Sequence, residues 1–202
     1  MVTVACVEWG DYQGRGAEYV AVLRDMVSRH LGQPHRFVCL TDAPSRHQVE
    51  TITLTPGRQG WWNKIELFRP HLFEGRVLYL DLDNIVVGPL DALLEQPGII
   101  YLTDWGWRKH CYGSGVMVWD AGDHVDAWER WTPNIAARLH GDQEWMTELG
   151  GWPALPAMLC RSLKYEGKDG PPPGAVVVCA HGKQKPADLA ETHWSRRYWR
   201  RE

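Results

Sequence analysis

One segment constrains the fold of this chain more than any other. Residues 77–87, VLYLDLDNIVV, form a nearly continuous apolar run that is interrupted by two acids. A run that is apolar on both faces is typical of a central strand in a sheet covered on both sides. The acids, Asp81 and Asp83, are two positions apart, so their side chains point the same way if the strand stays extended. The segment therefore predicts a buried strand that carries a pair of carboxylates.

Two carboxylates in such a place repel each other and lose hydration, which is costly unless something compensates. A divalent cation relieves both costs, and carboxylate oxygens favour Mg²⁺ or Mn²⁺ over zinc. Ligands of open α/β sheets also gather at the carboxyl ends of the strands. We therefore expect Asp81 and Asp83 to hold Mn²⁺ or Mg²⁺ together with substrate phosphates. The alternative is that one acid caps a turn while the other is solvated.

The rest of the chain alternates β-branched runs with helical periodicity. Strands are expected at 2–7, 36–41, 50–54, 99–103, 115–119 and 175–180, and helices at 17–31, 61–73, 123–140 and 142–149. This order predicts an α/β protein, a Rossmann-like three-layer α/β/α sandwich with a mainly parallel central sheet. We expect one domain over residues 1–190, followed by a tail at 191–202.

Composition excludes several classes. A net charge of −3 provides no overall basic field, so we expect no nucleic-acid partner. The odd count of 5 cysteines, without clustered spacing, argues against a disulfide framework. Cys6, Cys39 and Cys179 lie in apolar runs and are expected to be buried thiols of a cytoplasmic protein. The N-terminal run lacks the pattern of a signal peptide, and no stretch approaches the ~18 apolar residues of a membrane-spanning helix.

Polar residues follow other predicted elements. His181 comes directly after the strand at 175–180, in the segment HGKQKP. A neutral imidazole there can complete an Asp-Asp-His metal site, and Lys183 and Lys185 can hold phosphate charge. The alternative is a surface turn with solvated lysines.

The segment GDQEW places Asp142 and Gln143 at a helix start. They either cap the helix or reach a sugar with a carboxylate and an amide. Lys64 precedes the acidic strand and can pair with phosphate, an acid or water, while Asp104 is another carboxylate at a strand end.

Together these segments resemble the family 8 retaining glycosyltransferases, the glycogenin and bacterial lipopolysaccharide galactosyltransferase group, which have a GT-A fold. The similarity is strongest in LYLDLDNIVVGPLDALLE, which resembles the family's strand and DxD metal motif. YGSGVMVWD, GDQEW and HGKQKP resemble its Asn-Ser-Gly, Asp-Gln and His…Lys-Pro segments, and Lys64 matches its lysine before the DxD strand. The resemblance extends from the first strand to about Pro186.

The resemblance implies transfer of a sugar from a nucleotide-sugar, with a UDP-sugar favoured, to a carbohydrate or glycoconjugate acceptor with retention of configuration. Asp81, Asp83 and His181 would hold the metal ion, and Tyr19 would stack on the nucleobase. The residues implied to bind the nucleotide-sugar are Val7, Trp9, Tyr19, Lys64, Leu82, Ser114, Gly115, Gly182 and Lys185. The residues implied to line the donor sugar and the reacting centre are Lys64, Asp104, Asp142 and Gln143.

The chain departs from the family at Gly113, where the family has an asparagine, and in the shortened segment HGKQKP. These departures keep a non-catalytic module that binds sugar nucleotide or glycan as an alternative. A haloacid-dehalogenase-type phosphatase also ends an apolar strand in DxD, with the first aspartate as nucleophile. In that class the motif normally lies near the start of the domain, whereas here it follows three predicted strands.

Aromatic residues suggest two further contacts. The chain has 12 tryptophans among 202 residues, and a flat indole can either meet a sugar ring or fill the core. The tail THWSRRYWRRE at 192–202 interleaves arginines with aromatic residues. It could lie on an anionic surface such as the inner membrane face, or dock on the domain as an ordinary terminus.

Overall fold

The structure is a computed structural model that describes residues 1–102 and 110–202 of the chain. Its strands are β1 (Val2–Glu8), β2 (His35–Thr41), β3 (Glu50–Thr53), β4 (Arg76–Leu80), β5 (Asn84–Val86), β6 (Gly98–Leu102), β7 (Cys111–Asp120), β8 (Cys160–Ser162) and β9 (Val177–Cys179). Its α-helices are α1 (Gly16–His30), α2 (Asp91–Leu94), α3 (Asp126–Glu129), α4 (Pro133–Arg138) and α5 (Asp142–Leu149). Its 3₁₀ helices are η1 (Tyr12–Gly14), η2 (Pro44–Arg46), η3 (Gly60–Phe68), η4 (Pro186–Asp188) and η5 (Trp194–Arg197).

The central sheet has 6 strands in the order β3-β2-β1-β4-β7-β6. Strands β3, β2, β1 and β4 are parallel, whereas β7 runs antiparallel to both of its neighbours. Since β6 therefore points the same way as β4, the sheet is mainly parallel. This confirms the fold class expected from the alternation of strands and helices.

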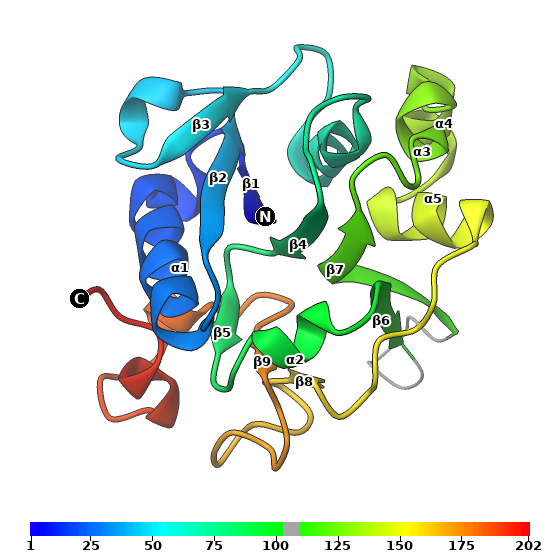
Figure 1. Ribbon diagram of the computed structural model, residues 1–202. Coiled ribbons are helices and arrows are strands. Elements are labelled where there is room, and N and C mark those ends of the chain that lie inside the picture. Colours follow the sequence, from blue (N-terminus) through cyan, green and yellow to red (C-terminus); the bar gives the residue numbers. More distant parts are fainter. Residues whose placement is uncertain (103–109) are drawn as a thin grey trace.

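The two faces of the sheet are covered by different layers (Figure 1). Val4 and Cys6 of β1 pack into one core cluster with Leu23 and Met26 of α1. Ala5, between them, belongs to a second cluster, which includes residues of η3, α3 and α5. Successive side chains of a strand point to opposite faces, so a strand covered on both sides is apolar at every position. That is why the β1 sequence shows no polar alternation.

The apolar run at 77–87 is not one strand, so that expectation is wrong. Strand β4 ends at Leu80, and β5 begins at Asn84 in a second sheet of 3 strands ordered β5-β9-β8. The backbone turns between them, because the Asn84 amide donates to the Asp81 carbonyl across 3.1 Å. After the turn Ile85 and Val86 are buried beneath α1 in the first core cluster. Both halves of the run are apolar because both are core strands, although of different sheets.

The helical segments differ from the expectation in type and in length. The helix at 17–31 is present as α1, and the helix at 142–149 as α5. The segment expected as a helix at 61–73 is the 3₁₀ helix η3. The expected helix at 123–140 is two short helices, α3 and α4, because Pro133 starts a new helix after an extended Thr132. Helix α2 and strand β8 were not expected from the sequence.

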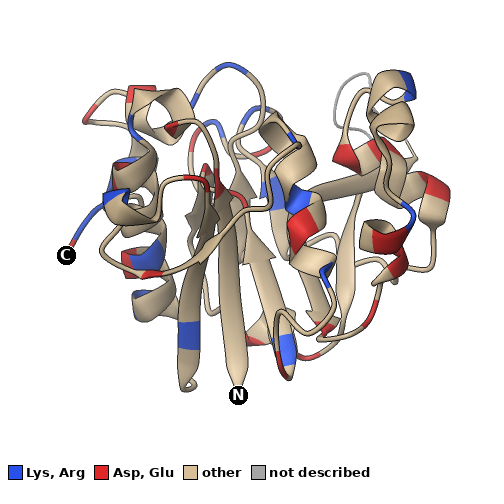
Figure 2. Cartoon of the chain, turned by 90° about the horizontal axis from the view of Figure 1, so that it is seen from above, with Lys and Arg blue, Asp and Glu red and all other residues tan. Residues whose placement is uncertain are grey.

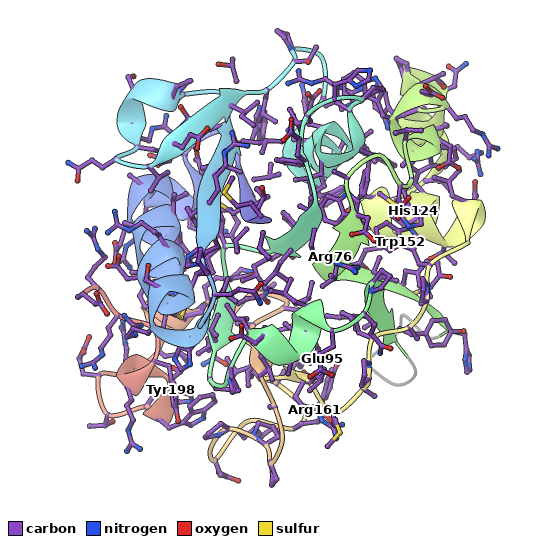
Figure 3. All side chains as sticks on the ribbon, in the orientation of Figure 1. Arg76, Glu95, His124, Trp152, Arg161 and Tyr198 are labelled. Atoms are coloured by element: carbon purple, nitrogen blue, oxygen red, sulfur yellow. The ribbon has the colours of Figure 1, made fainter. Side chains whose placement is uncertain are left out.

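Half of the described tryptophans are buried in the core. Buried examples are Trp62, Trp119, Trp145, Trp152 and Trp199. Trp152 is stacked on His124 with ring centroids 3.7 Å apart and planes 7° apart, as the labelled side chains in Figure 3 show. In contrast, Trp9 and Trp61 are 39% and 51% exposed. Cys6, Cys39 and Cys179 are buried free thiols, as expected.

The C-terminal tail docks against α1, near which the chain ends in Figure 1. Trp199 is 3% exposed and meets Tyr19 edge-on, with ring centroids 5.2 Å apart. Arg29 Nη2 donates to the Tyr198 carbonyl across 2.6 Å, and Arg201 Nε to Asp25 Oδ2 across 2.8 Å. The aromatic residues of the tail thus face the domain. Among the described residues, no helix is both long enough and apolar enough to span a bilayer.

Candidate active site

A pocket of about 730 Å³ opens at the carboxyl ends of the central strands, a size typical of small-molecule sites. In Figure 2 acidic residues, in red, gather at the end of these strands opposite the N-terminus. The pocket brings together predicted residues from segments far apart in the chain. Those that line it are Val7, Trp9, Lys64, Asp81, Leu82, Asp83, Gly115, Asp142, Gln143, His181, Gly182 and Lys185.

Asp81, the first member of the acidic pair, is held by an ammonium group and a phenol. Its Oδ1 lies 2.7 Å from Lys64 Nζ and accepts a hydrogen bond from the Tyr79 hydroxyl at 2.6 Å. Burial and the Asp81 charge raise the pKa of Tyr79, so the phenol stays a donor. Tyr79 precedes Asp81 by two positions and sits on the same side of the strand. Within an apolar run, this tyrosine carries no separate sequence signal of a site residue.

Asp83, the second member, has a matching arrangement. Its Oδ2 accepts hydrogen bonds from Lys185 Nζ at 2.5 Å and from the Tyr12 hydroxyl at 3.1 Å. Burial raises the pKa of Asp83, although Lys185 opposes that shift. Burial, followed by the charges of Asp83 and Asp81, raises the pKa of Tyr12. Each carboxylate therefore pairs one oxygen with a lysine and a tyrosine.

Asp142 lies at the start of α5, close to Lys64. It is 4% exposed, and its Oδ2 lies 3.7 Å from Lys64 Nζ. Burial raises the pKa of Asp142, against the effect of Lys64. Burial alone would lower the pKa of Lys64, but Asp142 and Asp81 reverse this and raise it. The Lys64 ammonium thus remains charged between two carboxylates.

Ser114 and Tyr19 do not line the pocket. Ser114 is fully buried, and its Oγ lies 3.2 Å from Lys64 Nζ, so it positions the lysine from behind. Tyr19 is 1% exposed in the core, packed edge-on against Tyr12 with ring centroids 5.1 Å apart. The expectation that Tyr19 stacks on a ligand is therefore wrong, because its ring is covered by the tail. Tyr12 lines the pocket instead.

His181 lines the pocket wall next to the second sheet. Its Nε2 lies 2.7 Å from Ser162 Oγ. Burial, then Lys164, lowers the pKa of His181, so the imidazole is neutral at neutral pH. Neutral imidazole is the form that binds metals. Asp104, the remaining predicted site residue, lies outside the described residues.

Carboxylate oxygens are the ligands that a hard divalent cation prefers. Asp81 and Asp83 each present a carboxylate, and Lys64 and Lys185 place ammonium groups against them. In the described part of the chain, no three His, Cys, Asp or Glu residues lie close enough together to hold a metal ion. The predicted Asp-Asp-His ligand set stays a prediction.

A buried glutamate anchors the loop after β1, which forms another wall of the pocket. Glu8 is fully buried, and its Oε1 accepts a hydrogen bond from the Tyr12 amide at 3.0 Å. Its Oε2 lies 2.9 Å from Thr41 Oγ1 and 3.1 Å from His47 Nε2. This network fixes the loop that carries Trp9 and Tyr12. A single acid at the end of an apolar strand was the only available sequence signal.

Gly113 is packed against a neighbouring strand. A Cβ placed there would lie 2.9 Å from Leu102 Cδ2 and 3.1 Å from its Cγ. The asparagine that the resembling family has at this position would not fit without movement of Leu102. The departure noted in the sequence therefore has a local packing reason.

No protein-family model matches the sequence, and no curated protein sequence matches it significantly. Solved structures do share its fold. The glycosyltransferase GlyE of Streptococcus pneumoniae TIGR4 superposes with a TM-score of 0.69 at 15% identity, over 92% of this chain and 56% of GlyE. This chain therefore spans little more than half the length of GlyE.

The galactosyltransferase LgtC, solved in complex with donor and acceptor sugar analogues, gives a TM-score of 0.67 at 14% identity. That superposition covers 96% of this chain and 93% of LgtC. An active-site mutant of LgtC gives a TM-score of 0.63, also at 14% identity. At such identities the likeness establishes the fold, which is that of GT-A glycosyltransferases.

Proposed function

We propose that this chain is a metal-dependent glycosyltransferase that moves a hexose from a nucleotide-sugar, with a UDP-sugar favoured, to a carbohydrate acceptor with retention. One observation carries the proposal. The pocket at the strand ends gathers Asp81, Asp83 and Asp142 with Lys64 and Lys185, in a fold shared with glycosyltransferases. These five groups sum to one negative charge (three acids, two lysines), so the site can accept a divalent cation.

The acidic pair is the proposed binding place for Mn²⁺ or Mg²⁺ and the donor diphosphate. Asp81 and Asp83 would hold the ion, with His181 reaching it from the second sheet. Such an ion neutralises charge on phosphate oxygens when it is bound. Lys185 lies against Asp83 and adds a second positive charge at this end of the pocket.

The proposed reaction breaks the bond between sugar C1 and the diphosphate, and negative charge develops on the departing phosphate oxygen. Lys185 is placed to stabilise that charge, the type of electrostatic contribution that is usually large in enzymes. Lys64 and Asp142, whose Nζ and Oδ2 atoms lie 3.7 Å apart, are the proposed contacts of the donor sugar, together with Gln143. The Asp142 carboxylate would shield positive charge that develops at C1.

The nucleobase is proposed to lie against the loop after β1. Val7, Trp9 and Gly10 line the pocket there, and Tyr12 joins that wall to Asp83. The Glu8 network holds this loop in place without the ligand, so little ordering would be needed on binding.

Donor binding is tested by thermal-shift measurements with UDP-, GDP- and CMP-sugars, each with and without Mn²⁺. A donor at about 100 times its Kd stabilises the folded chain by ~2.7 kcal/mol. We expect stabilisation by one nucleotide class, and a larger effect with Mn²⁺. Equal melting temperatures with and without every sugar nucleotide would contradict the proposal.

Turnover is tested with Asp81→Asn and Asp83→Asn, assayed for hydrolysis and transfer of the stabilising sugar nucleotide with Mn²⁺. We expect each variant to lose roughly 10²–10³ in rate, as when one electrostatic contact of a transition state is removed. Asp169→Asn, at an exposed position outside the pocket, is the matched control. Undiminished turnover in both pocket variants would end the metal assignment. Release of phosphate from a simple phosphomonoester would instead favour a phosphatase.

A further inference from the structure

Trp61 is much more exposed than the adjacent tryptophan in η3. It lines the pocket, yet it is 51% exposed, whereas its neighbour Trp62 is 8% exposed. Burying a large apolar side chain stabilises the folded chain, so an indole left half open forgoes part of this stabilisation. The open part of this indole is therefore accessible to a ligand that enters the pocket.

The Trp61 ring is held rigidly in spite of its exposure. Its Nε1 donates to the His140 carbonyl across 3.0 Å, and its ring lies 5.5 Å from the His140 ring with planes 31° apart. It also rests against the backbone of Gly141, where a Cβ would come within 2.8 Å of Nε1. A glycine is therefore required for this close approach. The indole is a fixed platform that needs no ordering when a ligand arrives.

The platform lies beside the reacting groups. Trp61 and Lys64 are three residues apart on the 3₁₀ helix η3, so their side chains project from the same side of it. Lys64 contacts Asp81 and Asp142, and Gly141 immediately precedes Asp142 in the chain. Trp61 is thus joined to Lys64 and Asp142 through both η3 and the start of α5. Lys185, assigned above to the diphosphate, contacts Asp83 instead.

We propose that Trp61 is the stacking platform of an acceptor subsite for a pyranose ring, an assignment that rests on the proposed transferase function. An indole face attracts the C–H bonds on one face of a pyranose, because the ring carries negative charge density above its plane. The hydroxyl groups at the sugar edge would meet polar groups that line the pocket. A simple alcohol acceptor has no such flat apolar face.

The subsite is tested by saturation-transfer NMR with methyl β-galactoside and methyl β-glucoside, recorded with UDP and Mn²⁺ present. We expect saturation of the C–H protons on one face of the bound ring. Trp61→Ala should weaken glycoside binding roughly tenfold or more, whereas Trp61→Phe, which keeps a flat ring, should stay within about threefold. Met158→Ala, which truncates a side chain that is 54% exposed and outside the pocket, is the control and should match the parent.

The outcomes separate this subsite from the transferase proposal. UDP affinity of each variant, measured by calorimetry, reports the donor site independently of Trp61. If the parent binds UDP but neither glycoside, or if Trp61→Ala binds the glycosides as the parent does, the subsite is wrong while the transferase proposal stands. If the parent binds no sugar nucleotide, the transferase proposal itself fails.

Discussion

Lys185 Nζ donates a hydrogen bond to Asp83 Oδ2 across 2.5 Å, and so joins two residues that are 102 positions apart in the chain. Both side chains are largely buried, with 13% and 12% exposure. The pair ties the loop after β9 to the turn between β4 and β5. An ionised pair in a pocket of this size is poised to exchange partners with a charged ligand, because both groups already lie on its wall.

Replacing Lys185, but not the nearby Lys183, should affect both stability and ligand binding. Lys185→Met removes the ammonium from a buried carboxylate, which should cost about 1–3 kcal/mol in free energy of unfolding. It should also weaken UDP binding roughly tenfold or more, since one phosphate contact is lost. Chemical denaturation and calorimetry measure the two effects. Lys183, the other lysine expected to hold phosphate charge, is exposed and does not line the pocket, so Lys183→Met should change neither quantity. Equal losses in both variants would contradict the assignment.

The raised pKa of Asp142 predicts how its removal changes the pH dependence of stability. Because burial raises the pKa of this carboxyl in the folded chain, the folded state binds the proton more tightly than the unfolded state. The stabilisation is complete below the unfolded pKa and is lost as the pH rises through the folded pKa. The asparagine of Asp142→Asn does not titrate. The variant should therefore gain stability relative to the parent from pH 4 to pH 7, so that its free energy of unfolding minus that of the parent increases. A difference that is flat or of opposite slope would contradict the pKa shift.

Gly113 and Leu102 should show coupled effects on stability. Gly113→Asn forces side-chain atoms against Leu102 and should cost about 1–3 kcal/mol in free energy of unfolding. Leu102→Ala alone should cost roughly 2–5 kcal/mol, because a buried side chain is lost. In the double variant the asparagine occupies the space vacated by leucine. The double variant should therefore lose less free energy of unfolding than the sum of the two single losses. Additive losses in a denaturation series would show that the two positions do not compete for space.

The docked tail should contribute measurably to the stability of the domain. Trp199→Ala removes an indole that is 3% exposed and packs on Tyr19, which should cost about 3–5 kcal/mol in free energy of unfolding. Arg200→Ala changes a neighbouring exposed side chain and should alter stability by less than about 0.5 kcal/mol. Equal melting temperatures of the Trp199 variant and the parent would mean that the tail is not held by this contact.

The sequence determined the architecture and about half of the residues that line the pocket. Apolar runs such as 77–87 indicate strands covered on both faces, and the alternation with helical segments fixes a mainly parallel sheet. Parallel strands end at one edge of a sheet, so the polar residues that follow them meet there. That rule accounts for Asp81, which directly follows β4, whereas His181 follows β9 of the second sheet; the structure places Asp81, Asp83 and His181 on one pocket wall.

The tertiary structure decided the contacts among these residues. Local sequence does not show that the apolar run divides between two sheets at Asp81, because both halves are equally apolar. Nor does it show that Tyr19 is covered by Trp199, while Tyr12 reaches Asp83. Helical spacing indicates only on which face of a helix a residue lies, and not what packs against that face. The pairing of Asp83 with Lys185 depends on packing between distant segments. The strength of an ionic contact depends on the distance between the two charges in space. The number of residues between them in the chain does not determine that distance.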